Sequence, residues 1–308
     1  MLTFHKTVGN ALTRIDSAEP GSWINLIAPT DEELRAVASV TGVDNDFLRA
    51  ALDDEETSRV EVEEDETLLI IDVPYAEEEE NGGRLFTTLP MGIIVAREHI
   101  ITVCLKENSI VREFAAGEVR NVQTALKTRF ILHMLLKVAN RYLFYLRQIE
   151  KISSSIEHQL YKSQKNKELI QLLTLEKSLV YFSTSLKSTD VTLEKLLRGR
   201  IIKLYEDDQD LLEDVLIEIK QAIEMAGIYS SILSGTMDAF ASVISNNLNI
   251  LMKTLTLITI LMTIPNIIFS FYGMNVTDLP IPTVWMPIAL AIAVTLGSWL
   301  LLKKKKLY

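Results

Sequence analysis

Two long uncharged segments at the C-terminal end most constrain how this chain can fold. Residues 254–272 contain no charged residue, and neither do residues 284–302. Each would be about 28 Å long as a helix, which is close to the hydrocarbon thickness of a bilayer. Two such segments in tandem are rare in soluble domains, so we expect membrane spans at about 251–272 and 284–302 rather than two buried core helices.

Lysines beside these segments predict their orientation. Lys303 to Lys306 follow the second segment directly, and Lys253 precedes the first. Cytoplasmic flanks of membrane spans are enriched in lysine and arginine. We therefore expect a multi-pass protein of the inner or plasma membrane, with both termini cytoplasmic, an outer loop at 273–283 and a basic cytoplasmic tail at 303–308.

Composition excludes several classes of function. The 308 residues carry a net charge of −10, which suits cations and disfavours nucleic acid as a partner. The single cysteine, Cys104, excludes a disulfide framework. The sequence has no phosphate-binding glycine loop, no nucleophile motif and no histidines at ligand spacing, so we expect no enzyme.

The first part of the chain predicts a cytosolic α/β domain at about 1–110. Thr30 is a helix N-cap whose capping box is completed by Glu33, and Gly42 ends that helix. A second short helix is expected at 46–52. Acidic residues 77–80, followed by Asn81-Gly82-Gly83, predict a hairpin tip. Alternating and apolar runs predict strands at 21–27, 59–62, 68–73, 85–95 and 100–105.

The middle of the chain predicts long cytosolic helices and a stalk at 111–250, followed by a transmembrane domain at 251–308. Leucine, lysine, glutamate and isoleucine at helical spacing predict helices at about 111–161, 166–199 and 207–272. The last of these would run about 100 Å, straight into the first span. Isolated glycines cost a helix only about 1 kcal/mol each, so we expect it to be continuous.

Polar residues in the first span follow one face of a helix. A polar stripe in a membrane either packs against another helix or faces water, and Asn266, deep in the span, favours a water-filled path. Two helices cannot enclose a pore, so several identical subunits would share it. The stripe alternates spacings of three and four residues and consists of Asn249, Met252, Thr256, Thr259, Thr263, Asn266 and Ser270.

The first span ends in the sequence Tyr272-Gly273-Met274-Asn275. Gly273 lets the helix stop and exposes a carbonyl, and Asn275 offers a side-chain oxygen. Such neutral groups hydrogen-bond to the water around Mg²⁺ without removing it. With the short loop, second span and lysine cluster that follow, the whole chain resembles the CorA family of Mg²⁺ channels.

This resemblance implies an α+β protein that assembles as a funnel-shaped homopentamer in a lipid bilayer and carries Mg²⁺, with Co²⁺ or Ni²⁺ as further ions in some members. Gly273, Met274 and Asn275 would be the selectivity filter, with the hydrated ion held in the outer sphere of Gly273 and Asn275. Met252 and Leu255 would form a hydrophobic gate, and Asp238 resembles an acidic ring below it. The implied pore positions are Asn249, Met252, Leu255 or Thr256, Asn266 and Ser270.

Regulation by Mg²⁺ is a further expectation from the resemblance, because the family senses cytosolic Mg²⁺ between neighbouring subunits. One of its carboxylates corresponds to Asp214. The usual partner is replaced by Arg49-Ala50, and Arg49 would repel a cation. Two interpretations stay open: Asp214 pairs with Arg49 without a metal, or the missing partner is supplied by Asp53, Asp54 or Glu55.

Two alternative functions remain at this point. Zinc-transporting relatives share the Gly-Met-Asn signature, and the outer loop of this chain has a single acid, Asp278. A membrane-anchored signalling scaffold is the alternative from another class. A scaffold needs neither a polar stripe nor Asn275, so the effect of Asn275→Ala on ion flux separates it from a channel.

Overall fold

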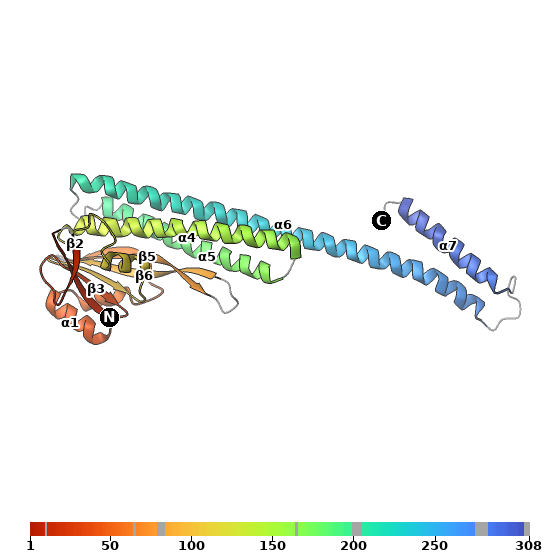
Figure 1. The fold of residues 1–308 in the computed structure, drawn as a ribbon, viewed down its shortest axis with the longest axis horizontal. Helices are drawn as coiled ribbons and strands as arrows, with labels where there is room; N and C mark the ends of the chain where they lie inside the picture. Colours follow the sequence, from red (N-terminus) through yellow and green to blue (C-terminus); the bar gives the residue numbers. More distant parts are fainter. Residues whose placement is uncertain are drawn as a thin grey trace. The chain divides into compact units, whose positions relative to one another are not determined.

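The computed structural model describes residues 1–9, 11–63, 66–78, 84–163, 166–198, 205–274 and 283–304 (Figure 1). The chain forms two compact units, Met1–Thr236 and Met237–Tyr308. Helix α6 (Glu206–Tyr272) is continuous, as predicted, and contributes to both units. Of the hairpin tip expected at 77–83, residues 79–83 lie outside the described residues. Helix breaks are expected at 163–166 and 199–205, and of these residues 164–165 and 199–204 lie outside the described residues.

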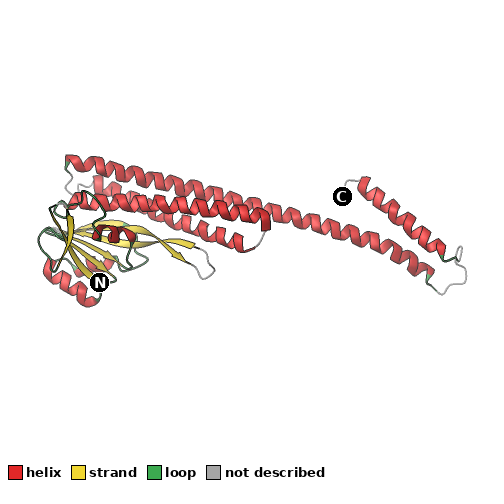
Figure 2. Cartoon of the chain, in the orientation of Figure 1, coloured by secondary structure: helices red, strands yellow, loops and turns green. Residues whose placement is uncertain are grey.

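A mixed seven-stranded sheet is the base of the first unit (Figure 2). Its order is β2-β1-β3-β7-β6-β5-β4, in which β3 and β7 pair in parallel and the other neighbours pair antiparallel. The predicted strands are confirmed, and β5 and β6 extend into a hairpin longer than expected. The strands are β1 (Leu2–Val8), β2 (Ala11–Ile15), β3 (Trp23–Ile27), β4 (Arg59–Glu63), β5 (Glu66–Glu78), β6 (Arg84–Val95) and β7 (Ile100–Cys104).

Strands β1 and β2 were not predicted, and the burial of their side chains explains why. In β1 the buried side chains are the polar residues Thr3 and His5, while apolar neighbours such as Phe4 are only half-buried. His5 stacks on Trp23 at a centroid distance of 5.0 Å. The alternation of β1 therefore runs opposite to the hydropathy pattern on which strand prediction depends.

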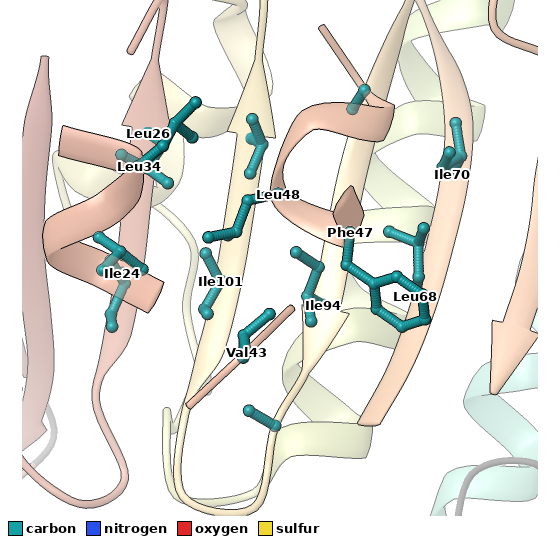
Figure 3. Packing of buried hydrophobic residues seen from close by; sticks show 14 residues of the cluster. Ile24, Leu26, Leu34, Val43, Phe47, Leu48, Leu68, Ile70, Ile94 and Ile101 are labelled. Carbon is teal, nitrogen blue, oxygen red and sulfur yellow. The ribbon is translucent and has the colours of Figure 1, made fainter. Parts of the chain in front are cut away.

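One face of the sheet is covered by α1 (Asp31–Thr41) and α2 (Asn45–Ala50). The predicted capping box is confirmed, since Thr30 Oγ1 accepts from the Glu33 amide and Glu33 Oε2 accepts from the Thr30 amide. Gly42 ends α1 in the left-handed conformation, with φ of 81°. Figure 3 shows the resulting core, in which Leu34, Phe47 and Leu48 pack on side chains from the strands.

On the other side of β3, buried polar side chains are joined by a series of hydrogen bonds. The indole N–H of Trp23 donates to Thr102 Oγ1 at 2.9 Å, and that hydroxyl donates to Asn25 Oδ1 at 3.0 Å. Around the indole, Phe114 and Phe130 pack at centroid distances of 6.2 and 5.4 Å. The indole N–H of Trp23 and the Thr102 hydroxyl are thus paired, as burial requires.

The predicted helix at 111–161 is wrong at its start. The structure has a short α3 (Ser109–Ala115), and α4 (Lys127–Ser163) begins only after a turn. Gly117 has φ of +70°, a conformation outside an α-helix. Thr124 exchanges hydrogen bonds of 3.1 and 3.0 Å with Thr7. The turn is therefore held by strand β1, which the sequence analysis also missed.

Helices α4, α5 (Asn166–Arg198) and the first part of α6 lie together along the sheet (Figure 1). The Arg129 guanidinium of α4 is 3.2 Å from the Asp208 carboxylate of α6. Buried apolar residues of α6 recur at spacings of three, four and seven, which is the pattern of a helix-packing seam. They are Leu212, Val215, Ile219, Ala222, Ala226 and Leu233.

Hydroxyl groups of α5 dock that helix onto the sheet. Thr192 Oγ1 and Ser188 Oγ donate to the Ser58 carbonyl at 3.0 and 3.2 Å. The buried Asp72 carboxylate lies within hydrogen-bonding reach of Ser185 and Ser58. Burial nevertheless raises the pKa of Asp72 above its ordinary value, because these bonds do not replace the lost hydration of the charge.

This raised pKa predicts a pH-dependent stability. Stability is greatest below the unfolded-state pKa, where Asp72 is neutral in both states, and falls as pH rises through the folded-state pKa. Asp72→Asn should therefore raise the melting temperature of the detergent-solubilised protein at pH 7 by about 2–4 °C, the effect of a ~1 kcal/mol change. The gain should disappear near pH 4. Asp16→Asn, at an exposed site, is the control, and an equal gain at both pH values would contradict the assignment.

Candidate functional site

Two helices of the second unit are long and apolar enough to cross a membrane: the C-terminal part of α6, and α7 (Trp285–Lys304). In their most apolar windows, 0% and 6% of the residues are buried within the described chain. The core helix of a soluble protein would instead be covered by its neighbours. These surfaces therefore require lipid or further protein around them, as the sequence analysis expected.

The face of α6 that turns toward α7 is apolar. Pro265 of α6 lines a cavity together with Ala291, Ile292, Thr295 and Leu296 of α7. At about 100° per residue, the half-buried residues of this part of α6 fall on the side opposite the polar stripe. These half-buried residues are Leu257, Leu261, Ile264, Pro265, Ile268 and Tyr272.

The polar stripe faces away from α7. Every residue assigned to it by sequence is exposed in the single chain, together with Leu255, so the structure places all of them on one uncovered face of α6. What covers this face in the membrane must come from outside the chain. The residues are Asn249, Met252, Leu255, Thr256, Thr259, Thr263, Asn266 and Ser270.

Threonine hydroxyls of the stripe donate their protons to their own helix. Thr256, Thr259 and Thr263 each donate to the carbonyl four residues earlier, at 2.8, 2.9 and 2.7 Å. A hydroxyl has one proton and two lone pairs, so each of these oxygens can still accept but no longer donates outward. These three hydroxyls thus present only acceptors outward, while the uncharged amides of Asn249 and Asn266 can both accept and donate.

The start of the stripe differs from the rest in chemistry. Met252 and Leu255 are apolar and 55% and 60% exposed, so they interrupt the row of acceptors on the same face. Asp238 lies 11 residues before Asn249, about three helical turns, and is also exposed on this face. Along the helix, the acid Asp238 is followed by the amide of Asn249 and then by the apolar pair Met252 and Leu255. The threonine hydroxyls come next, followed by the amide of Asn266 and the hydroxyl of Ser270.

Gly273 directly follows Tyr272, the last residue of α6. Its φ is not left-handed, and its amide donates to the Phe269 carbonyl at 2.9 Å. A Cβ at this position would lie 3.2 Å from that carbonyl oxygen and 3.6 Å from the Ser270 oxygen. The glycine therefore leaves the carbonyl end of the helix open, where the backbone carries partial negative charge.

Met274 is the last described residue of the Gly-Met-Asn motif. Its amide lies 3.4 Å from the Phe271 carbonyl, and its side chain is 56% exposed. Asn275 and Asp278, to which the sequence analysis assigned roles at the outer mouth, lie outside the described residues. The open carbonyl end of α6 at Gly273 is thus the described part of this motif.

The acidic regulatory candidates lie on two different elements of the chain. Asp214 is exposed on α6, and Asp53 and Asp54 are exposed in the turn after α2, where Asp53 Oδ1 accepts from the Glu55 amide at 3.0 Å. Arg49 forms an ion pair with Asp31 of α1. Within the described ranges, no group of three or more histidine, cysteine, aspartate or glutamate side chains is arranged to hold a metal.

Sequence analysis assigned no role to Pro265 or Thr295, which the structure places on the same cavity. A proline inside an otherwise uninterrupted span is a signal for a site of altered backbone bonding. The periodicity of the two helices does not predict that Thr295 of α7 lies on the same cavity as Pro265. This placement depends on how the two helices pack, which only the structure provides.

Comparison with known proteins gives consistent matches over most of the chain. The family model described as CorA-like Mg²⁺ transporter protein matches residues 19–304. The Cobalt/magnesium transport protein CorA of Methanocaldococcus jannaschii is 27% identical over 285 residues, which cover 88% of this chain and 86% of that protein.

Solved structures agree with this match. The complete structure of the CorA magnesium transporter from M. jannaschii is similar with a TM-score of 0.81 and 25% identity, covering 96% of this chain and 94% of the other. The full-length CmaX protein has a TM-score of 0.74 at 16% identity, covering 99% and 97%, and shows a shared fold.

Cysteines placed on the two faces of α6 should react differently in a bilayer. We expect an aqueous maleimide to modify Thr263→Cys, on the stripe, at least about tenfold faster than Ile264→Cys, because the thiolate forms only in contact with water. The wild-type protein is the control, since Cys104 is buried and burial raises its pKa to about 12. Equal labelling of both variants would contradict a water-facing stripe.

Proposed function

Since the chain belongs to the CorA-like Mg²⁺ transporter family, we propose that it conducts hydrated divalent cations, Mg²⁺ first among them, across a membrane into the cytoplasm. The stripe of uncharged acceptors on α6 is the observation that carries this proposal. Water bound to a cation points its hydrogens outward, and Thr256, Thr259 and Thr263 offer only lone pairs to them. Mg²⁺ gives up its water reluctantly, and a stripe without carboxylates does not demand that it do so.

Several copies of the chain must share the pathway. The stripe is exposed in one chain and lies opposite the side that packs on α7, so a single chain cannot enclose it. Cyclic symmetry would bring this face of each α6 to a common axis. The homopentamer implied by the resemblance to the CorA family is the assembly that we propose, in a multi-pass membrane protein.

The order of residues along α6 suggests how ions move. At the outer end, the open carbonyl end of α6 at Gly273, with Met274 and the Asn275 amide, would hold the hydrated ion. At the other end, Met252 and Leu255 would form an apolar constriction that closes by losing its water. Asn249 and Asp238 would lie on the cytoplasmic side of this gate.

The charges that flank the spans support a cytoplasmic location for the first unit. Lys253 precedes the span in α6, and Lys303 and Lys304 end α7, so the basic residues gather where the chain enters and leaves the membrane. Lys303 Nζ lies 5.1 Å from the Trp299 ring centroid, an arrangement typical of the membrane interface. We propose the cytosolic domain at 1–110, the helices and stalk at 111–250, and the transmembrane domain at 251–308.

Feedback by Mg²⁺ is the weaker part of the proposed mechanism in this chain. Asp214 would need an acidic partner from a neighbouring copy, for which Asp53 and Asp54 are exposed and available. Arg49 lies in the helix that precedes these acids, and its charge is already engaged by Asp31. We propose that Asp214 contributes little to closure by internal Mg²⁺.

Replacement of Asn275 tests the transport function. In proteoliposomes, Asn275→Ala should lower Mg²⁺ uptake by about tenfold or more, corresponding to about 1.4 kcal/mol, because it removes the side-chain oxygen that holds the hydration shell. Asn140→Ala, an exposed asparagine of α4 that bonds to its own helix, is the matched control. Wild-type vesicles offered Co²⁺, Ni²⁺ and Zn²⁺ in turn establish the ion range.

The outcomes of this experiment separate the competing functions. Uptake of Zn²⁺ in preference to Mg²⁺ would favour a zinc transporter on the same fold. Absence of uptake of any of these ions by correctly assembled wild-type protein would favour a membrane-anchored scaffold.

Asp214→Ala tests the regulatory proposal. With 10-fold graded internal Mg²⁺, about 0.1 to 10 mM, we expect the concentration that halves uptake to change less than about fivefold, because one surface carboxylate contributes at most about 1 kcal/mol. A large loss of inhibition in this variant would show that Asp214 binds the regulatory ion despite Arg49.

A further inference from the structure

Pro265 leaves a backbone acceptor without its helical donor. It lies inside α6 and has no N–H, so the carbonyl of Leu261, four residues earlier, lacks the hydrogen bond that a helix normally provides. In hydrocarbon such a group has no water to turn to, and proline is tolerated in spans because neighbouring side chains satisfy the freed carbonyl. A donor is therefore expected close to Pro265.

Thr295 of α7 is a donor without an acceptor. Its hydroxyl oxygen is buried, and no hydrogen-bond partner for it exists among the described residues. It differs in this from Thr256, Thr259 and Thr263, each of which donates to its own helix. The proton of Thr295 is thus uncommitted in a region where an unmet polar group is costly.

The proline and the unmet hydroxyl lie at one place in the fold. Pro265 and Thr295 line the same cavity between α6 and α7, and its remaining described lining is apolar, with Ala291, Ile292 and Leu296. Ala291 precedes Thr295 by one helical turn and is 4% exposed, so this face of α7 is covered there. No other side chain of the described lining carries a hydrogen-bond donor.

We infer that the Thr295 hydroxyl donates, through one bound water, to the Leu261 carbonyl and so joins α7 to α6 at the proline. This inference rests on the proposed transport function, because the residue after the proline, Asn266, belongs to the polar stripe. Thr295 is thus a positioning residue. It does not touch the ion, but it fixes the orientation of the outer part of α6, from Asn266 to the Gly273 carbonyl.

A double-mutant cycle tests this positioning role. Thr295→Val keeps the shape of the side chain and removes the donor, so we expect Mg²⁺ uptake in proteoliposomes to fall about three- to tenfold, or about 0.7–1.4 kcal/mol. Thr295→Ser should restore wild-type uptake. In the Pro265→Ala background the backbone regains an amide N–H at this position, which can serve the Leu261 carbonyl. Adding Thr295→Val to that background should therefore have no further effect.

Controls separate positioning from simple loss of folding. Thr254→Val removes a hydroxyl that donates to the Ile250 carbonyl of α6 itself, and its effect should be the same in the wild-type and Pro265→Ala backgrounds. Assembly and melting temperature are measured for every variant. Uptake is compared only among correctly assembled variants, because a merely structural loss would not depend on residue 265 in this way.

Each result decides the inference. An equal effect of Thr295→Val in both backgrounds, no effect in the wild-type background, or failure of serine to restore uptake would overturn it. Absence of uptake by the assembled wild-type protein would instead contradict the proposed function, so the two failures are distinguishable.

Discussion

The apolar part of α6 depends on which acceptor each threonine hydroxyl donates its hydrogen bond to. In hydrocarbon a free donor or acceptor is costly, and the stripe threonines meet this constraint by donating to carbonyls of their own helix. The same bonds leave only lone pairs on the outward side of these three hydroxyls. A surface of acceptors repels no cation and attracts the outward-pointing hydrogens of its water shell. One local hydrogen bond thus both stabilises the span and gives its exposed face a chemistry suited to hydrated cations.

Much of the soluble unit follows from local rules. The capping box at Thr30 and Glu33 and the runs that form β5, β6 and β7 are readable because each signal lies within a few residues. Strand β1 is not readable, since its buried residues are polar and their burial depends on Trp23 and the turn before α4. That turn, mistaken for helix, depends in its own right on β1 through Thr7 and Thr124. Two errors therefore have one origin, a contact between segments more than 100 residues apart.

The candidate site likewise has features that local sequence patterns predict and features that depend on contacts between distant residues. Helical periodicity alone places the stripe on one face of α6, from Asn249 to Ser270. It does not reveal which face α7 covers, nor that the backbone at Gly273 is not left-handed. The ion pair of Arg49 with Asp31 is equally invisible, because nothing in the spacing of α1 and α2 indicates that these side chains meet.

The selectivity of the proposed pathway among divalent cations depends on the ligand types that the described stripe does not contain. Transition metals exceed Mg²⁺ in affinity chiefly through imidazole and thiolate ligands, and the stripe contains neither. Uncharged oxygen acceptors that touch only the water shell distinguish ions by the size of that shell and by how tightly the ion binds it, rather than by the affinity of the ion for protein ligands. A pathway of this kind would pass several octahedral hydrated cations and retain none of them strongly. Discrimination would then arise at the outer site proposed near Gly273, and in the proposed assembly the spacing of copies around the axis would set how closely the hydration shell is held there.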